Sequence, residues 1–234
     1  TQQFGPQDLA VRGEHVYWTT GVEDAVVKAP ISGGALTVLF NGTPGATSIA
    51  VDDENVYWTH VNTNLVMSVP TAGGKAAVVA ASSYPRGIAV DATHIYWTDE
   101  STNAVMRAPI GGGPATQIAT GDQPRALVVD AVNVYWVNQN GGSIMKAPLD
   151  GGATIELAST VTPGTLAVDE TSVYWTHSLS AVSRVPIVGG AVTAVTSGQP
   201  GLASVAVDAT SVYWTNGGTS ENDYLDGSIM RVAK

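Results

Sequence analysis

Apolar residues along the chain come in short runs, and glycine, proline, aspartate and asparagine stand between them. Within residues 44–83 the runs are Ile49–Asp52, Val56–Thr59, Leu65–Pro70 and Ala76–Ala80. Runs of this length with turn-forming residues between them lack the spacing of an amphipathic helix. The pattern predicts four short β-strands that form one antiparallel meander.

The second of these runs contains a Tyr-Trp pair, and the pair returns through the whole chain. The tryptophans stand 40 and then four times 39 residues apart, at Trp18, Trp58, Trp97, Trp136, Trp175 and Trp214. A period of about 40 residues indicates a repeat architecture. Six four-stranded antiparallel units predict an all-β fold, a six-bladed β-propeller that spans residues 1–234 as a single domain.

The alternation within the motif predicts how the blades pack. Val56 and Trp58 face one side of their strand, whereas Tyr57 and Thr59 face the other. Both sides are mainly apolar or aromatic, which is typical of a sheet buried between two neighbours. We therefore expect the tryptophans to pack between blades rather than to stack on a bound sugar.

The two ends of the chain predict how the propeller closes. The last repeat has a third strand at Ser228–Val232 and no fourth strand after it. Thr1–Phe4 precedes Pro6 in the way that Thr116–Ile118 precedes Pro124. We expect a three-plus-one closure, in which the N-terminal strand completes the last blade and leaves no free sheet edge.

Several polar residues recur from repeat to repeat, which favours structural roles. An aspartate ends five first strands and is expected to accept hydrogen bonds from turn amides: Asp52, Asp91, Asp130, Asp169 and Asp208. Glycine pairs such as Gly33-Gly34 are expected to supply the positive φ angles of hairpin turns. Basic residues on the third strands are expected to be solvated: Lys28, Arg107, Lys146, Arg184 and Arg231.

Composition narrows the classes of partner. The net charge is −10, which argues against nucleic acid because phosphate binding requires a basic surface. No apolar run approaches the ~20 residues of a membrane-spanning helix, so no membrane span is predicted. The absence of cysteine excludes disulfides, thiolate metal ligands and a thiol nucleophile. We expect a monomer.

At the Tyr-Trp strands the chain resembles the YWTD β-propellers of the low-density lipoprotein receptor family and similar bacterial multi-repeat proteins. The full tetrapeptide occurs at Tyr96–Asp99. The fourth position is occupied elsewhere by Thr20, His60, Asn138, His177 and Asn216. The resemblance implies six blades and a rigid extracytoplasmic binding scaffold, secreted, periplasmic or at the cell surface.

Departures from the repeat mark candidate functional residues. The loops between blades and the loops after the Trp strands are expected on one face, around the central channel, where ligands bind rigid scaffolds. The residue after the inter-blade proline is Gln7, Gly45, Arg86, Arg125, Gly164 or Gly201.

Arg86 and Arg125 come from successive blades and should stand side by side, with Tyr84 close by. Two guanidinium groups there would bind a carboxylate or phosphate through paired hydrogen bonds. Asp99 and Asn138 complete the candidate ligand-binding set. In the alternative interpretation, the arginines form salt bridges with acidic loop residues, namely Asp99, Glu100 or Asp122.

The last blade carries an insertion at residues 217–227. Its oxygen ligands Glu221, Asp223 and Asp226 would suit calcium, although their spacing differs from that of an EF-hand loop. The alternative is a flexible polar loop beside the channel. His60 and His177 lie in opposite blades and should not share a metal ion, so capping or surface roles are expected. No other cofactor is predicted.

No nucleophile elbow, His-Glu-x-x-His pair or phosphate-binding glycine loop occurs. The sequence therefore favours a non-enzymatic binding propeller for a small anionic ligand, a glycan or a peptide at the channel mouth. One alternative is a metal-dependent hydrolase or lyase of the six-bladed propeller type. A second alternative is a structural module of a longer surface protein.

Overall fold

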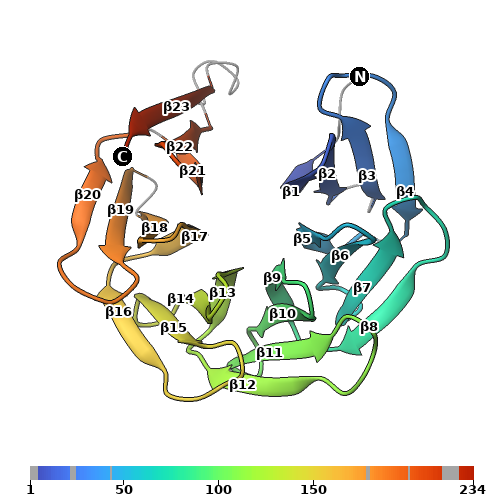
Figure 1. Cartoon of the computed structure of the whole chain (residues 1–234), viewed down its shortest axis with the longest axis horizontal. Coiled ribbons are helices and arrows are strands. Elements are labelled where there is room, and N and C mark those ends of the chain that lie inside the picture. Colours follow the sequence, from blue (N-terminus) through green and yellow to red (C-terminus); the bar gives the residue numbers. More distant parts are fainter. Residues whose placement is uncertain (1–4, 22–24, 43, 178–179, 200, 218–226) are drawn as a thin grey trace. The chain divides into compact units, whose positions relative to one another are not determined.

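A computed structural model of the chain describes residues 5–21, 25–42, 44–177, 180–199, 201–217 and 227–234. All regular elements within these ranges are β-strands. The chain divides into two compact units, Thr1–Thr120 and Gly121–Lys234. Each unit contains three antiparallel sheets built from consecutive strands, which we number as blades one to six (Figure 1).

The first unit holds three four-stranded blades whose strands pair in chain order. Blade one consists of β1 (Pro6–Arg12), β2 (His15–Thr20), β3 (Ala25–Pro30) and β4 (Thr37–Asn41). Blade two consists of β5 (Ala46–Val51), β6 (Asn55–His60), β7 (Leu65–Pro70) and β8 (Ala77–Ala81). Blade three consists of β9 (Pro85–Val90), β10 (His94–Asp99), β11 (Ala104–Pro109) and β12 (Thr116–Thr120).

The second unit repeats this order. Blade four consists of β13 (Pro124–Val129), β14 (Asn133–Asn138), β15 (Ser143–Pro148) and β16 (Ile155–Ser159). Blade five consists of β17 (Pro163–Val168), β18 (Ser172–His177), β19 (Ala181–Pro186) and β20 (Thr193–Thr196). Blade six has three strands among its described residues, β21 (Leu202–Val207), β22 (Ser211–Asn216) and β23 (Ser228–Ala233).

These six sheets confirm the predicted fold class, a six-bladed β-propeller. In each unit the first strands lie next to one another and the fourth strands spread apart (Figure 1). The expected strand Thr1–Phe4 lies outside the described residues, so the three-plus-one closure stays a prediction. So does the organisation of residues 1–234 as one domain.

The Trp side of one blade packs against the Tyr side of the blade before it. The aromatic pairs that share a buried cluster are Tyr17 with Trp58, Tyr57 with Trp97, Tyr135 with Trp175 and Tyr174 with Trp214. Trp58 and Trp97 are both 0% exposed. The predicted packing between blades is therefore confirmed for these tryptophans, and none of them has an open ring face for a sugar.

The recurring aspartate accepts hydrogen bonds from both the turn and the tyrosine of its blade. One carboxylate oxygen of Asp130 accepts the amides of Val132 and Asn133, each at 2.7 Å. The other oxygen accepts the hydroxyl of Tyr135 at 2.7 Å. The turn bonds were predicted and are confirmed. The same set of bonds occurs at Asp52, Asp91, Asp169 and Asp208.

Blade one departs from this scheme because Arg12 takes the place of the aspartate. The Arg12 Nε and Nη2 atoms donate to the two carboxylate oxygens of Asp53 in blade two, at 2.7 and 2.9 Å. Both side chains are exposed, Arg12 by 51% and Asp53 by 78%. Water therefore screens the pair, which should contribute little to stability.

The threonine of the motif links successive blades. Each first strand carries a register shift near its start, for example between Ala46 and Ile49. The Thr59 hydroxyl accepts the Ser48 amide within this bulge at 3.2 Å and donates to the Arg86 carbonyl of blade three at 2.6 Å. A buried hydroxyl therefore bonds the backbones of two blades at once.

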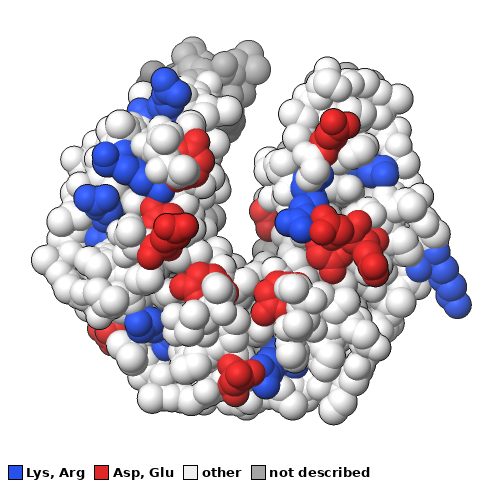
Figure 2. All heavy atoms as spheres, in the orientation of Figure 1, with Lys and Arg blue, Asp and Glu red and all other residues white. Residues whose placement is uncertain are grey.

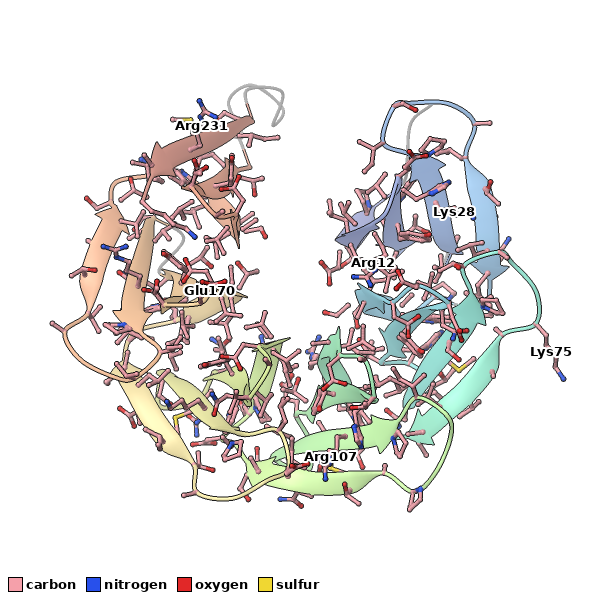
Figure 3. All side chains as sticks on the ribbon, in the orientation of Figure 1. Arg12, Lys28, Lys75, Arg107, Glu170 and Arg231 are labelled. Atoms are coloured by element: carbon pink, nitrogen blue, oxygen red, sulfur yellow. The ribbon has the colours of Figure 1, made fainter. Side chains whose placement is uncertain are left out.

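Two of the third-strand lysines also link blades, which corrects the expectation that these residues are solvated. Lys28 Nζ donates to the Thr71 carbonyl of the next blade at 2.6 Å, and Lys146 Nζ donates to the Ile187 carbonyl at 2.6 Å. The long aliphatic stem lets the ammonium group reach the neighbouring hairpin. By contrast, Lys75 projects outward from the β7–β8 loop (Figure 3).

The glycine pairs have the predicted positive φ angles, 85° at Gly33 and 141° at Gly34. They do not form a two-residue hairpin, because six residues separate β3 from β4. The Gly33 amide instead closes a four-residue turn by donating to the Pro30 carbonyl at 3.0 Å. Backbone conformation, rather than close packing, explains the choice of glycine here.

Replacing Tyr57 with phenylalanine should lower the free energy of unfolding by about 1–2 kcal/mol, because Asp52 loses a buried donor. The control is Tyr17→Phe, since Arg12 stands where the acceptor would be. We expect that control to change stability by less than about 0.5 kcal/mol. Denaturant unfolding measures both values, and equal losses would contradict the role given to the aspartate.

Stability should fall in acid as these carboxylates become protonated. Burial raises the pKa of Asp130, but hydrogen bonds from Tyr135 and the turn amides outweigh it and hold the pKa below its usual value. Because the pKa is lower in the folded state, this stability is present above about pH 4 and is lost as pH falls further. Thermal unfolding between pH 7 and pH 2 should therefore decline more steeply for the wild type than for Asp130→Asn. Parallel declines would refute this.

Candidate functional site

The loop end of each first strand pairs with the residue that follows Tyr-Trp-Thr, so the six blades can be aligned by register. Pro85, for example, pairs with Asp99, and Ala46 pairs with His60. In this alignment the residues equivalent to Arg86 are Gln7, Thr47, Arg125, Gly164 and Ala203.

The sequence comparison anchored on proline was therefore wrong in two blades. Gly45 and Gly201 are equivalent to Tyr84 rather than to Arg86. The prolines at positions 44 and 200 stand two residues earlier than those that begin the other first strands. Proline is common at such junctions, but backbone pairing sets the register.

Blade three differs from the other blades at the register position of Tyr84. The equivalent residues of the other five blades all have positive φ angles: Gly5, Gly45, Gln123, Thr162 and Gly201. Tyr84 is not among the described residues with positive φ. The chain therefore enters β9 by a different path, and the Tyr84 side chain lies against Arg86.

Arg86 is held by two neighbours within blade three. Its Nε donates to Glu100 Oε2 at 2.7 Å, and its Nη2 donates to the Tyr84 hydroxyl at 3.3 Å. The guanidinium carbon also lies 4.5 Å from the centre of the Tyr84 ring, close enough for a cation–π interaction. The salt bridge that we considered as the alternative for Arg86 is thus present, with Glu100 as its partner.

Asp99 is 3% exposed and bonded to its own loop. Its carboxylate accepts the Ser82 hydroxyl at 2.5 Å, the Ser83 amide at 2.6 Å and the Thr102 amide at 3.0 Å. Burial raises the pKa of Asp99, but these hydrogen bonds outweigh it, so the pKa lies below its usual value. Asp99 is therefore a buried anion that these hydrogen bonds stabilise.

Sequence analysis missed the residues that pair with the tryptophan indoles. The Ser82 hydroxyl accepts the Trp97 indole N–H at 3.1 Å and connects it to Asp99. Thr160 and Gln199 accept the indoles of their own blades at the same offset, fifteen residues before the tryptophan. A polar residue recurring at that offset is the signal that could have revealed them.

In blade four, Asn138 itself accepts the hydrogen bond of the tryptophan indole. Its Oδ1 accepts both the Trp136 indole and the Asp122 amide at 2.9 Å, and its Nδ2 donates to the Ser143 hydroxyl at 3.2 Å. The side-chain atoms of Asn138 thus bond to the framework. Its role in ligand binding stays a prediction, as does that of Asp99.

Arg125 lies on β13 of the second unit, in the same register position as Arg86, and is half-buried. Arg86 belongs to the first unit. The expectation that the two guanidinium groups form one anion site stays a prediction.

The histidines have local partners. His60 is 3% exposed, and its Nδ1 bonds the Thr63 hydroxyl at 2.9 Å, which is the capping role that was predicted. His177 Nε2 bonds the Ser183 hydroxyl at 2.9 Å, and burial lowers the pKa of His177.

Glu221, Asp223 and Asp226, the predicted calcium ligands, lie outside the described residues. Across the described ranges, no three His, Asp or Glu side chains gather closely enough to hold a metal ion. On the face shown in Figure 2, acidic side chains gather over the inner strands of each unit; Glu170 lies in the β17–β18 turn (Figure 3). The same ranges contain no helix that is long and apolar enough to cross a bilayer.

The chain matches no protein family profile and no curated protein by sequence. Its fold is similar to that of a chain in the nidogen–laminin complex, with a TM-score of 0.72 and 20% identity, over 94% of this chain and 88% of that one. A catalytically inactive virginiamycin B lyase from Staphylococcus aureus, crystallised with quinupristin, has a TM-score of 0.81 and 14% identity, over 100% and 84%. A gluconolactonase from Xanthomonas campestris has a TM-score of 0.72 and 16% identity, over 91% and 82%.

These similarities establish the fold class, a β-propeller shared by a protein-binding assembly and by enzymes. At identities of 14–20% they establish nothing beyond the fold. The activities of those proteins do not transfer to this chain.

Asp99→Ala should lower the free energy of unfolding by about 3 kcal/mol, because the donors at Ser82, Ser83 and Thr102 lose their acceptor. The matched control is Asp53→Ala, in an exposed salt bridge, which should change stability far less. Urea unfolding distinguishes the two. A residue that serves ligand binding alone would leave stability unchanged, and such a result would reverse our structural assignment of Asp99.

Proposed function

We propose that this chain is a YWTD-like, non-enzymatic binding propeller that acts outside the cytoplasm. Its loop-bearing face would accept a small anionic ligand, a glycan or a peptide. The observation that carries the proposal is the cluster of Tyr84, Arg86 and Glu100. It replaces the framework residues of other blades with large polar side chains at the loop end of β9.

The first strands of the first unit support this assignment. Gln7, Thr47 and Arg86 occupy the same register position on three neighbouring inner strands. The polar groups therefore form a row at one end of adjacent strands. Such a row on a rigid sheet edge can recognise a ligand without a moving part, because the strands fix the side chains in advance.

The recurring carboxylates are poor candidates for a general acid. Asp91 and Asp130 direct one oxygen to turn amides and the other to a tyrosine. These hydrogen bonds stabilise the ionised form, as the lowered pKa values show. A general acid requires the opposite shift, toward a raised pKa, which Asp91 and Asp130 do not have.

A thermal-shift screen tests the proposal, with organic acids, sugars, short peptides and divalent ions as the ligands. A ligand at ~100 times its dissociation constant should stabilise the chain by about 2.7 kcal/mol. We expect an anionic or peptide hit that weakens in Arg86→Ala and in Arg125→Ala. The control Arg12→Ala, which changes an arginine in the β1–β2 turn region, should retain it.

Two other results would overturn the assignment. Stabilisation by a divalent ion that both arginine variants retain would favour the metal-dependent hydrolase or lyase, with the loop at residues 217–227 as its site. A screen without any hit would favour the structural module of a longer surface protein.

A further inference from the structure

We propose that Glu100 is a positioning residue that orients Arg86 to bind a monoanionic carboxylate and that disfavours a dianionic phosphate. This inference rests on the proposed binding function and names the ligand chemistry of the same face. The carboxylate would belong to a small molecule or to the C-terminus of a peptide.

Arg86 is held in place before any ligand arrives. Glu100 accepts from Nε, and Tyr84 accepts from Nη2 and lies against the plane of the guanidinium. The Glu100 side chain is 14% exposed, so water screens this ion pair less than it screens one at the surface. An arginine with a fixed plane loses less side-chain entropy on binding than a mobile one.

One edge of the guanidinium stays available. Nε and one N–H of Nη2 are used by Glu100 and Tyr84. Among the described residues, Nη1 donates no hydrogen bond, and the Arg86 side chain is 29% exposed. The N–H groups of Nη1 and the second N–H of Nη2 form the end-on edge, which matches the two oxygens of a carboxylate.

Charge at the cluster selects between anions. Arg86 contributes one positive charge, and the Glu100 carboxylate lies against it, 2.7 Å from Nε. A monoanion can still gain two charge-assisted hydrogen bonds at the end-on edge, whereas the second charge of a phosphate dianion is repelled by the Glu100 carboxylate.

The arrangement is particular to blade three within the first unit. The residues equivalent to Tyr84 are Gly5 and Gly45, and those equivalent to Glu100 are Gly21 and Val61. Blades one and two therefore cannot hold an arginine in this way. A recurrent structural role would have left a similar pair in at least one of them.

The test follows the Arg86 Nε–H resonance of the 15N-labelled full chain at pH 7.5, where phosphate is mainly dianionic. The probes are N-acetylglycine, inorganic phosphate, the peptide N-acetyl-Ala-Ala-Ala with a free carboxylate, and its C-terminal amide. We expect both carboxylates to bind more tightly than phosphate, and the amide not to bind. Comparison of N-acetylglycine with the peptide tells a small-molecule site from a peptide site.

Glu100→Gln should lower the preference for carboxylate over phosphate by about tenfold, because it removes one adjacent charge and loosens Arg86. Tyr84→Phe keeps the ring and the charge and should leave that preference unchanged, while both affinities fall. Arg12→Ala is the control and should alter neither value. A purely structural Glu100 would change the melting temperature without changing the preference.

The outcomes separate this inference from the proposed function. Equal or tighter phosphate binding by the wild type, or an unchanged preference in Glu100→Gln, overturns the role of Glu100. The binding function survives that result if hits in the screen still depend on Arg86. If no probe shifts the Arg86 resonance, the inference fails. The proposed function is then tested by the sugars and peptides of the thermal-shift screen.

Discussion

The packing of a tryptophan on the tyrosine side of the blade before it, at Trp58, Trp97, Trp175 and Trp214, is the contact on which the rest of each unit depends. Rings such as Trp97 and Tyr57 are 0% and 2% exposed, and losing one buried aromatic side chain costs about 3–5 kcal/mol. Both rings also carry a polar group into the interface. An unpaired buried donor costs about 1–3 kcal/mol, so a partner for these groups stabilises the interface, although the buried Trp58 indole has none.

The need for such partners explains most of the polar residues that recur. The tyrosine hydroxyl needs an acceptor and finds the aspartate that also closes the turn, as Tyr135 finds Asp130. The indole needs another, which Ser82 supplies for Trp97 and Asn138 supplies for Trp136. Recurrence therefore identifies the framework in this protein, and the few positions that break the repeat are where specific binding can arise.

The blades were predictable from sequence because a 39-residue period and strict alternation act together on every repeat. Strand β7 has the predicted bounds, Leu65–Pro70, and β6 differs from its prediction by one residue at each end. The alignment of the loops was not predictable, because proline marks a junction without setting which residues pair. The contacts of Lys28 and Lys146 with the next blade were also missed, since a long side chain on an exposed-looking strand carries no pattern of its own.

The candidate site was predictable only in part, for a related reason. Arg86 and Tyr84 were found because they break the repeat, but Glu100 was considered only as one salt-bridge partner among several acidic residues. Its importance depends on where the loop before β9 turns, and only the backbone shows that Tyr84 avoids the left-handed conformation of its five equivalents. A repeat predicts what its units share. The candidate site lies where blade three takes a different backbone path, and only the structure shows that path.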